Sequence, residues 1–412
     1  MKIKMKYSKN THAIRHGLMI AGLATAVTLP TAHAADSITE AFTSGTTYAD
    51  LNLRYETADQ DNALADADAL TLRTRLGYKT DTFNGFSAVV ELEDSREVLG
   101  VDDFSVPPAG VRAGEFSVIA DPETTELDQG YIQYSGGGFT AKVGRQVIAL
   151  DGQRFVGHVG WRQDRQTFDA VTLTYAPIDS IKLTGSQLSQ RNRIFGEEAN
   201  IQSEDTLLNA AFTTSFGKFV AYAYLLEVDS DVENSLDTVG ISFSGSAPVG
   251  SNKLLYTAEI ASQEANDVID TDYLWLEGGY SFSGITAKIG YEELGSDDGA
   301  GGFSTPLATL HKFNGWTDQF LATPAEGLTD FYVSATGKVA GGTWLIAYHD
   351  FTSDEDAVGG FDDLGDEINL QYVRPIGKNY AVAAKYGSYS AGDAAFGKVD
   401  TDRLWLWLNA KF

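Results

Sequence analysis

The residues best suited to chemistry gather in one basic and aromatic segment, residues 151–166. It holds three arginines and two large aromatic side chains, and a fourth arginine stands shortly before it: Arg154, Arg162, Arg165, Phe155, Trp161 and Arg145. A guanidinium stays charged at any relevant pH, and its planar fork can bind a carboxylate through two hydrogen bonds. The segment is therefore a candidate for contacting an anionic solute.

Other kinds of chemistry are poorly represented. The chain has no cysteine, which excludes disulfides, zinc–thiolate sites and thiol nucleophiles. Only His158, His311 and His349 remain after residue 34, and no Gly-x-Ser-x-Gly motif is present. Acidic runs near residues 66–68 and 354–366, which we expect in two of the loops, could bind Ca²⁺, but neither has EF-hand spacing. We expect no catalytic residue, no metal site and no cofactor, and therefore no enzyme.

The N-terminus has the features of a secretory signal. Five basic residues within the first fifteen precede an apolar run over residues 17–29, and Ala32 and Ala34 supply the small residues that a signal peptidase reads. We expect residues 1–34 to be a cleaved signal peptide, because the apolar run is too short for a membrane anchor. The remainder, residues 35–412, holds 25 basic and 57 acidic residues, and its net charge of −32 argues against a nucleic-acid partner.

Residues 35–412 alternate between apolar and polar side chains over many short segments. Leu72 and Leu76 alternate with Arg73 and Arg75, and residues 285–292 repeat the pattern. A period of two is typical of strands with one apolar and one polar face. Segments of about ten residues match tilted membrane strands, and no stretch approaches the ~18 apolar residues of a transmembrane helix.

Three further observations favour a membrane barrel over a soluble sandwich. Short turns such as residues 80–84 and 135–138 alternate with longer acidic loops, which is the asymmetry of outer-membrane barrels. The eight prolines after residue 34 all fall in our expected loops or turns, where no ladder hydrogen bond is needed. The chain ends in strict alternation from Leu404 to Phe412, and a terminal Phe on such a strand resembles the assembly signal of outer-membrane proteins.

The segments predict an all-β, single-domain transmembrane antiparallel barrel over residues 35–412, with about eighteen strands and sixteen as the alternative. Their expected centres lie near residues 52, 74, 90, 131, 143, 172, 185, 210, 223, 240, 257, 276, 289, 332, 346, 370, 384 and 407. The two longest loops are expected at residues 99–126 and 295–327. Such a protein would lie in the outer membrane of a Gram-negative bacterium. Its partners would be lipid, lipopolysaccharide bridged to acidic loops by divalent ions, and the assembly machinery that reads the strand ending at Phe412.

Charged residues are distributed unevenly along the predicted wall. Eleven of the thirteen arginines after residue 34 lie between residues 54 and 193. The predicted strands turn six charged side chains into the lumen: Arg54, Arg73, Arg75, Glu91, Glu93 and, beside the first strand once the barrel closes, Arg403. A basic wall beside an acidic wall would set up a transverse field across a water channel. The alternative is that these charges pair across strands and only solvate the wall.

Several motifs resemble the alginate export family of outer-membrane barrels. They are Gly144-Arg145-Gln146, Gln153-Arg154-Phe155, Trp161-Arg162-Gln163, Gln166-Thr167-Phe168-Asp169-Ala170, the stretch from Thr309 to Phe320, and Gly327-Leu328-Thr329-Asp330. The resemblance implies an eighteen-stranded barrel with an arginine-rich constriction that passes an anionic polysaccharide. Arg145, Arg154, Arg162 and Arg165 are where this chain could supply that constriction. The strongly acidic remainder departs from a uniformly electropositive channel.

Three functions are consistent with these features. The leading hypothesis is a passive porin-type channel for small polar or anionic solutes. The second is a dedicated export channel for an anionic exopolysaccharide such as alginate. The third is a structural or adhesive barrel with a closed lumen. We expect residues 151–166 to fold inward and place some of their arginines in the channel.

Overall fold

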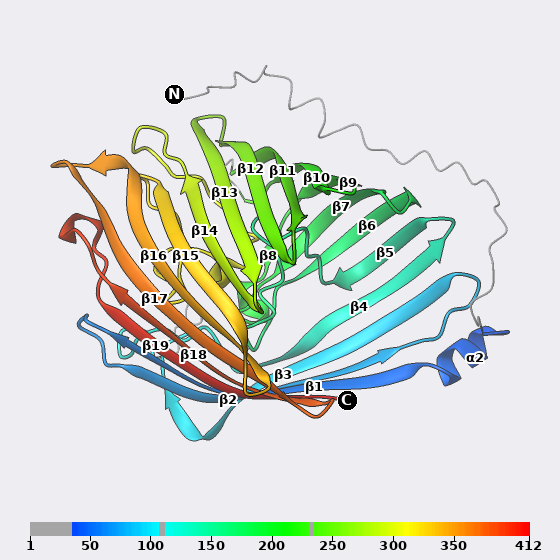
Figure 1. Ribbon diagram of the computed structural model, residues 1–412. Coiled ribbons are helices and arrows are strands. Elements are labelled where there is room, and N and C mark those ends of the chain that lie inside the picture. Colours follow the sequence, from blue (N-terminus) through cyan, green and yellow to red (C-terminus); the bar gives the residue numbers. More distant parts are fainter. Residues whose placement is uncertain (1–34, 107–111, 231–233) are drawn as a thin grey trace. The chain divides into compact units, whose positions relative to one another are not determined.

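The computed structural model describes residues 35–106, 112–230 and 234–412, so the expected signal peptide lies outside the described residues. Almost all regular structure is β-strand (Figure 1). A short helix, α2 (Ile38–Thr43), comes first, and the side chain of Ser37 caps it by accepting a hydrogen bond from the backbone N–H of Glu40. Within the described ranges, no helix has the length and apolar character needed to cross a membrane.

The strands follow one another along the whole described chain. In order they are β1 (Thr46–Gln60), β2 (Ala67–Lys79), β3 (Phe86–Asp103), β4 (Thr124–Gly136), β5 (Phe139–Gln146), β6 (Thr167–Ile178), β7 (Ile181–Asn192), β8 (Ile201–Gln202), β9 (Thr206–Thr213), β10 (Gly217–Leu226), β11 (Leu236–Val249), β12 (Asn252–Ala265), β13 (Ile269–Phe282), β14 (Ile285–Leu294), β15 (Leu328–Val339), β16 (Gly342–Ala357), β17 (Phe361–Ile376), β18 (Tyr380–Ser390) and β19 (Thr401–Lys411). Every expected strand centre falls inside one of them.

Apart from the short strand β8, each strand pairs antiparallel with its neighbours in the chain, and β1 pairs with β19, which closes the sheet. The two-residue strand β8 pairs only with the end of β7, while β7 pairs directly with β9 and so keeps the wall continuous. Eighteen strands therefore form the wall. The predicted closed antiparallel barrel of eighteen strands is confirmed, and no sheet edge remains open within it.

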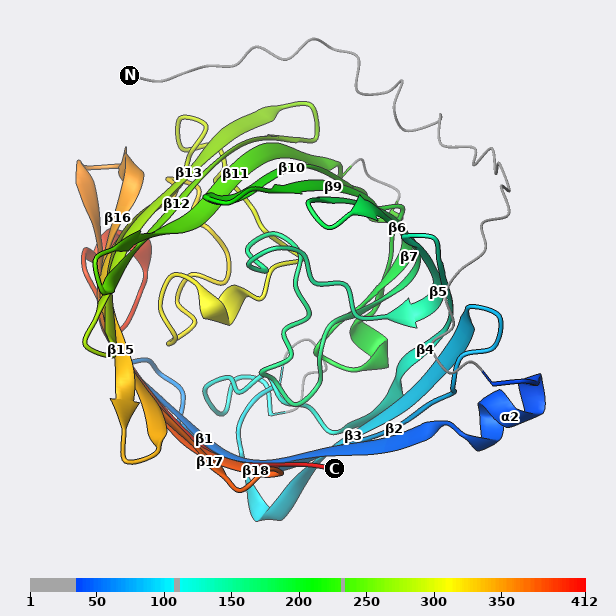
Figure 2. The same ribbon diagram turned by 45° about the vertical axis from the view of Figure 1, so that its right-hand side comes forward.

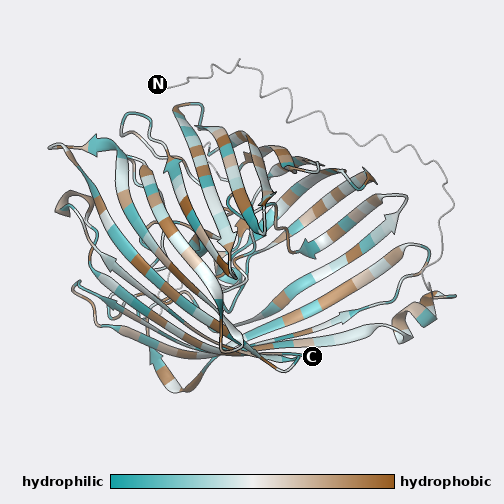
Figure 3. Ribbon diagram, in the orientation of Figure 1, coloured by the Kyte–Doolittle hydropathy of each residue, from teal (hydrophilic) through white to brown (hydrophobic). Residues whose placement is uncertain are grey.

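The two faces of the wall differ in the way the alternation predicts. Ile289, Leu370 and Leu406 are exposed on the outer face, and Leu72 shares the outer face of β2 with exposed Leu76. Arg73 and Arg75, on the other face of β2, are buried inside the barrel. Figure 3 shows apolar and polar residues alternating along the strands. The outer face is thus suited to lipid and the inner face to a polar lumen.

Connections of two to six residues lie at one end of the barrel, and the long loops lie at the other end together with a few short turns such as residues 266–268 and 358–360. Gly137 and Gly138 alone join β4 to β5, and both adopt a positive φ that glycine tolerates without strain. The loop expected at residues 295–327 is observed with those bounds. The loop expected at residues 99–126 is shorter, residues 104–123, because β3 continues pairing with β2 as far as Asp103.

Two other expectations need correction. The acidic residues 354–356 and 362–366 lie in β16 and β17 rather than in a loop, because these strands extend the ladder at the barrel end, where acidic side chains remain exposed or half-buried. Pro177, Pro248 and Pro375 are each the second-last residue of a strand instead of turn residues. A proline so close to a strand end gives up little of the ladder. Pro107 and Pro108 lie outside the described residues.

Candidate functional site

Two long connections fold into the lumen instead of extending away from it. We call residues 147–166, between β5 and β6, the first inward loop, and residues 295–327, between β14 and β15, the second inward loop. Figure 2 shows both inside the ring of strands. They pair with each other: Val156 and Leu307 form a parallel bridge, and the Gly157 N–H donates to the Leu307 carbonyl at 2.8 Å. The two loops therefore support one another across the lumen.

Aromatic packing explains why these loops carry large side chains. Phe155 lies 5.2 Å from the rings of both Tyr222 and Tyr273, which project inward from β10 and β13. Trp161 stacks on His311 of the second inward loop at 3.4 Å between ring centroids. Such contacts bury Phe155 and leave Trp161 only partly exposed. The predicted inward course of residues 151–166 is what the structure shows.

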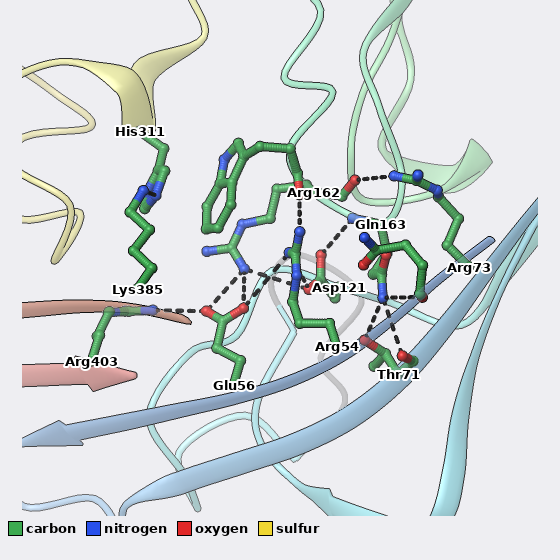
Figure 4. Close-up of polar contacts among 12 residues, drawn as sticks. Arg54, Glu56, Thr71, Arg73, Asp121, Arg162, Gln163, His311, Lys385 and Arg403 are labelled. Atoms are coloured by element: carbon green, nitrogen blue, oxygen red, sulfur yellow. Dashed lines mark hydrogen bonds and ion pairs between the residues drawn. The ribbon is translucent and has the colours of Figure 1, made fainter. Parts of the chain in front are cut away.

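Arg162 contacts three carboxylates, more than any other side chain of the first inward loop (Figure 4). Its Nη1 donates to both carboxylate oxygens of Glu56 on β1, at 2.8 and 3.0 Å, and its Nη2 donates to Asp318 at 3.1 Å. Asp121 lies 3.6 Å away. Burial alone would lower the pKa of the Arg162 guanidinium, but Glu56, Asp121 and Asp318 outweigh burial and hold that pKa above its ordinary value.

Three arginines of the neighbouring wall hold the backbone of the same loop. Arg54 on β1 and Arg73 and Arg75 on β2 donate to three successive backbone carbonyls, those of Trp161, Arg162 and Gln163. Figure 4 shows Arg54 and Arg73 beside the loop. Each of the three arginines also has a carboxylate partner: Asp121, Asp50 and Glu93 respectively. The wall thus fixes the inner turn of the loop through both charge and backbone hydrogen bonds.

The remaining predicted site residues are also engaged in ion pairs. Arg154 pairs with Glu292 on β14 and donates to Thr305 and Asn314 of the second inward loop, each at 3.1 Å. The other partners, given as pairs, are Arg165 with Asp128 and Glu91, Arg403 with Glu56, and Arg145 with Asp169. Burial acts to lower the pKa of Arg165, but Asp128 and Glu91 more than offset it.

Nine of the ten predicted site residues therefore occupy the lumen wall and the first inward loop, whereas Arg145 shares a face of β5 with exposed, lipid-facing Val143. All eight of the arginines have a carboxylate within 4.0 Å. Eight of the ten side chains are buried: Arg54, Arg73, Arg75, Glu91, Glu93, Arg154, Arg162 and Arg403. Arg145 and Arg165 are partly exposed. This geometry agrees with the alternative drawn from the sequence, in which the charged side chains pair with one another. A direct contact between these arginines and a solute stays a prediction.

A cavity that the sequence did not single out lies beside the inward loops. Its volume is about 290 Å³, and its lining combines lysines with aromatic rings: Lys288, Lys312, Phe313, Trp316, Trp275 and Tyr332 among others. Lys288 pairs with Glu277 at 2.8 Å, whereas exposed Lys312 donates to the backbone carbonyl of Gly152 at 2.7 Å. Partial burial, and then the charge of Lys288, lower the pKa of Lys312. The sequence did point to part of this cavity, because residues 309–320, which supply several lining side chains, resemble a motif of the alginate export family.

A closed antiparallel barrel with an apolar outer face and a charged lumen defines the class of outer-membrane porin-type barrels. Solved structures of outer-membrane barrels share this fold. OccAB4 of Acinetobacter baumannii is 13% identical with a TM-score of 0.73, covering 89% of this chain and 98% of that chain. OpdQ of Pseudomonas aeruginosa is 12% identical with a TM-score of 0.69, covering 91% and 99%. OpdK of the same organism, solved with vanillate, is 11% identical with a TM-score of 0.70, covering 89% and 98%.

Residues 46–289 match the model of the alginate export family, and the chain belongs to this family. No match was found among curated protein sequences. Family and fold together place the protein in the outer membrane of a Gram-negative bacterium, in contact with lipid.

Proposed function

We propose that the protein is a passive channel for small polar or anionic solutes. The observation that carries this proposal is the pair of inward loops, which are tied to the wall by buried ion pairs such as Arg162–Glu56 and Arg154–Glu292. An eighteen-stranded barrel is wide enough for an aqueous channel unless loops fold into it. Loops fixed in this manner narrow the lumen permanently, which suits small solutes better than bulky ones.

The lining of the cavity supports the anionic part of the proposal. Lys312 is exposed and its ammonium faces a cavity with several aromatic rings, so a carboxylate-bearing solute could pair with the lysine while its ring or chain packs against them. Partners of this kind in a wet lumen are weak enough to release the solute again. The similar barrel OpdK is solved with vanillate, and we propose solutes of that size class for this chain.

The predicted constriction divides into two roles within this proposal. Arg154, Arg162 and Arg165 belong to the loop that narrows the passage, and Arg145 lies near the end of β5, just before that loop. Arg54, Arg73, Arg75, Arg403, Glu91 and Glu93 hold the loop in place. Because the guanidinium charges are largely compensated by carboxylates, anion preference should be modest. It should fade as salt rises past the point where the Debye length is about 8 Å.

Export of an anionic exopolysaccharide is the second candidate, and membership of the alginate export family is the observation that favours it. A structural barrel with a closed lumen is the third. Oligouronates of increasing length distinguish the first two: an export channel should be blocked more strongly by longer oligomers, whereas a small-solute channel should be blocked by monomers.

Three further features belong to the same proposal. The chain performs no catalysis; residues 1–34 are removed as a signal peptide from the barrel domain of residues 35–412; and the strand that ends at Phe412 engages the assembly machinery. Mass spectrometry of outer-membrane protein should find an N-terminus at Ala35 or within a residue or two. Deletion of Phe412 should reduce the amount of assembled barrel, and unchanged assembly would contradict that role.

Single-channel recording in planar bilayers tests the main proposal. The purified barrel should give steady open steps in KCl, and added small carboxylates should block them more strongly than neutral sugars of equal size. A barrel that inserts but never conducts would overturn the proposal and favour the closed, structural alternative.

A further inference from the structure

We propose that Glu93, Glu126 and Asp164 form a binding site for one divalent cation that ties the first inward loop to the barrel wall. Glu93 on β3 and Glu126 on β4 are direct partners in the antiparallel register, so their side chains project side by side from the wall. Asp164 reaches them from the first inward loop. One carboxylate oxygen from each of the three groups lies within 4.8 Å of the others.

These carboxylates are buried and incompletely bonded. Glu93, Glu126 and Asp164 expose 1%, 5% and 0% of their surface. Within the described residues, Oε1 of Glu93, Oε2 of Glu126 and Oδ1 of Asp164 have no hydrogen-bond donor. The hydroxyl of fully buried Ser95, two positions beyond Glu93 on the same face of β3, is also without a partner. Buried oxygens left in this condition are costly unless a ligand binds them.

The charges nearby do not compensate the three carboxylates. Arg75 pairs with Glu93, but it also lies 3.4 Å from Asp128. Across the part of the chain that the structure describes, neither Glu126 nor Asp164 has a cationic side chain within 4.0 Å. Asp164 accepts a bond from the backbone N–H of Gly196 at 3.0 Å and shares a side-chain hydrogen bond with Glu126. The cluster therefore carries excess buried negative charge, which a divalent cation would neutralise.

The donor set indicates which cation fits. All three donors are carboxylate oxygens, the ligands of hard cations, and neither a histidine nor a cysteine is among them. Ca²⁺ accepts irregular geometry with six to eight oxygens, some of them water, whereas Mg²⁺ requires a near-ideal octahedron. A site split between two strands and a loop suits the more tolerant ion. Ca²⁺ is therefore the probe of choice.

Shared protons are the competing explanation for the cluster. Burial, and then the charges of Glu126 and Glu93, raise the pKa of Asp164 well above its usual range, so a proton could take the place of the cation. The two explanations differ in their response to added Ca²⁺. A bound cation makes stability depend on Ca²⁺ concentration, whereas shared protons make it depend on pH alone.

Calorimetric titration with CaCl₂ and thermal unfolding test the site on the full barrel, folded in detergent and first treated with chelator. Asp164→Asn and Glu126→Gln remove one ligand each with little change in shape, and Asp298→Asn removes an exposed acid of the second inward loop as the matched control. Wild type and the control should bind one Ca²⁺ and melt at a higher temperature with it. Each ligand variant should bind Ca²⁺ at least about tenfold more weakly.

Two results would overturn the site. One is identical Ca²⁺ binding in all four proteins, because the ions would then lie on acidic residues elsewhere. The other is an Asp164→Asn barrel that melts above wild type in chelator while Ca²⁺ changes neither protein, because protons would then occupy the cluster. If Asp164→Asn does not fold, the Glu126→Gln variant decides between the same outcomes.

Discussion

Arg162 and Glu56 are 106 positions apart in the chain, yet the guanidinium of one lies 2.8 Å from the carboxylate of the other, and both are buried in the lumen. Arg54 and Arg403 share the same carboxylate, at 3.9 and 3.4 Å. Glu56 therefore connects strand β1, strand β19 and the first inward loop. This cluster lies where the two ends of the sheet close the barrel.

Removal of the Arg162 charge should release the first inward loop. Arg162→Ala leaves Glu56 and Asp318 buried with one cationic partner fewer, and breaking a buried pair in this way typically costs about 3–5 kcal/mol. Chemical denaturation of the detergent-folded barrel measures the change in free energy of unfolding. Arg96→Ala, which breaks a half-exposed pair with Asp94 on the outer part of β3, is the matched control and should cost less than about 1 kcal/mol. Equal losses in the two variants would show that the buried pair has no special role.

Lys312, the exposed lysine of the cavity lining, should determine how well carboxylates enter. Lys312→Glu reverses the one exposed charge that the second inward loop contributes to the cavity lining. Block of single-channel current by a small carboxylate should weaken by about tenfold, as expected for loss of a charged hydrogen bond. Lys378→Glu makes the same charge change in an exposed turn at the far end of the barrel. If both variants weaken block equally, overall charge rather than this cavity governs entry.

A charged side chain placed on the outer, lipid-facing side of the barrel should destabilise the fold. Ile289→Arg places a guanidinium on the lipid-facing side of β14 and should cost about 2–4 kcal/mol of folding free energy in lipid vesicles. Lys288→Arg, one residue away on the lumen side, keeps an existing charge and should be close to neutral. A larger loss from the Lys288 substitution would mean that the two faces have been assigned the wrong way round.

A feature of this fold could be predicted from the sequence only where it depends on residues close together in the chain. Alternation is local, so all eighteen strands and their faces could be located from residues such as Leu72, Arg73, Ile289 and Leu406. Strand ends were less accurate, because ladder pairing carries β3 beyond its apolar segment to Asp103. The strands of the wall therefore continue to pair beyond the point where apolar and polar residues stop alternating in the sequence.

The site was only partly readable for the same reason. Phe155 and Trp161 predicted an inward loop, since neither suits a solvated one. The partners of its arginines could not be assigned, because Glu56, Asp318 and Glu292 come from distant parts of the chain. The carboxylate cluster of Glu93, Glu126 and Asp164 was missed entirely, because two strands and a loop must meet before its members are neighbours.

Acid should loosen the contact between the two inward loops through His311. Burial lowers the pKa of this imidazole well below 6.5, although Asp318 acts in the opposite direction. Between that lowered pKa and 6.5 the unfolded chain binds a proton that the folded chain does not, so stability falls as pH falls through this range. The slope contributed by one group is at most about 1.4 kcal/mol per pH unit.

Melting temperatures of wild type and His311→Gln between pH 8 and pH 5 measure this contribution. The variant lacks the titrating ring and should lose less stability on acidification. Parallel pH profiles for the two proteins would show that His311 is not the group responsible.

Single-channel recording of the Arg154→Ala/Arg162→Ala double variant beside wild type tests the central claim, that paired arginines hold two loops across an open channel. The account predicts a steadily conducting wild type and a variant with higher conductance. It also predicts a reversal potential shifted toward cation selectivity, because the variant loses two positively charged side chains from the lumen while the carboxylates of Glu292 and Glu56 remain. A double variant that folds and inserts but keeps both the conductance and the selectivity of wild type would contradict it.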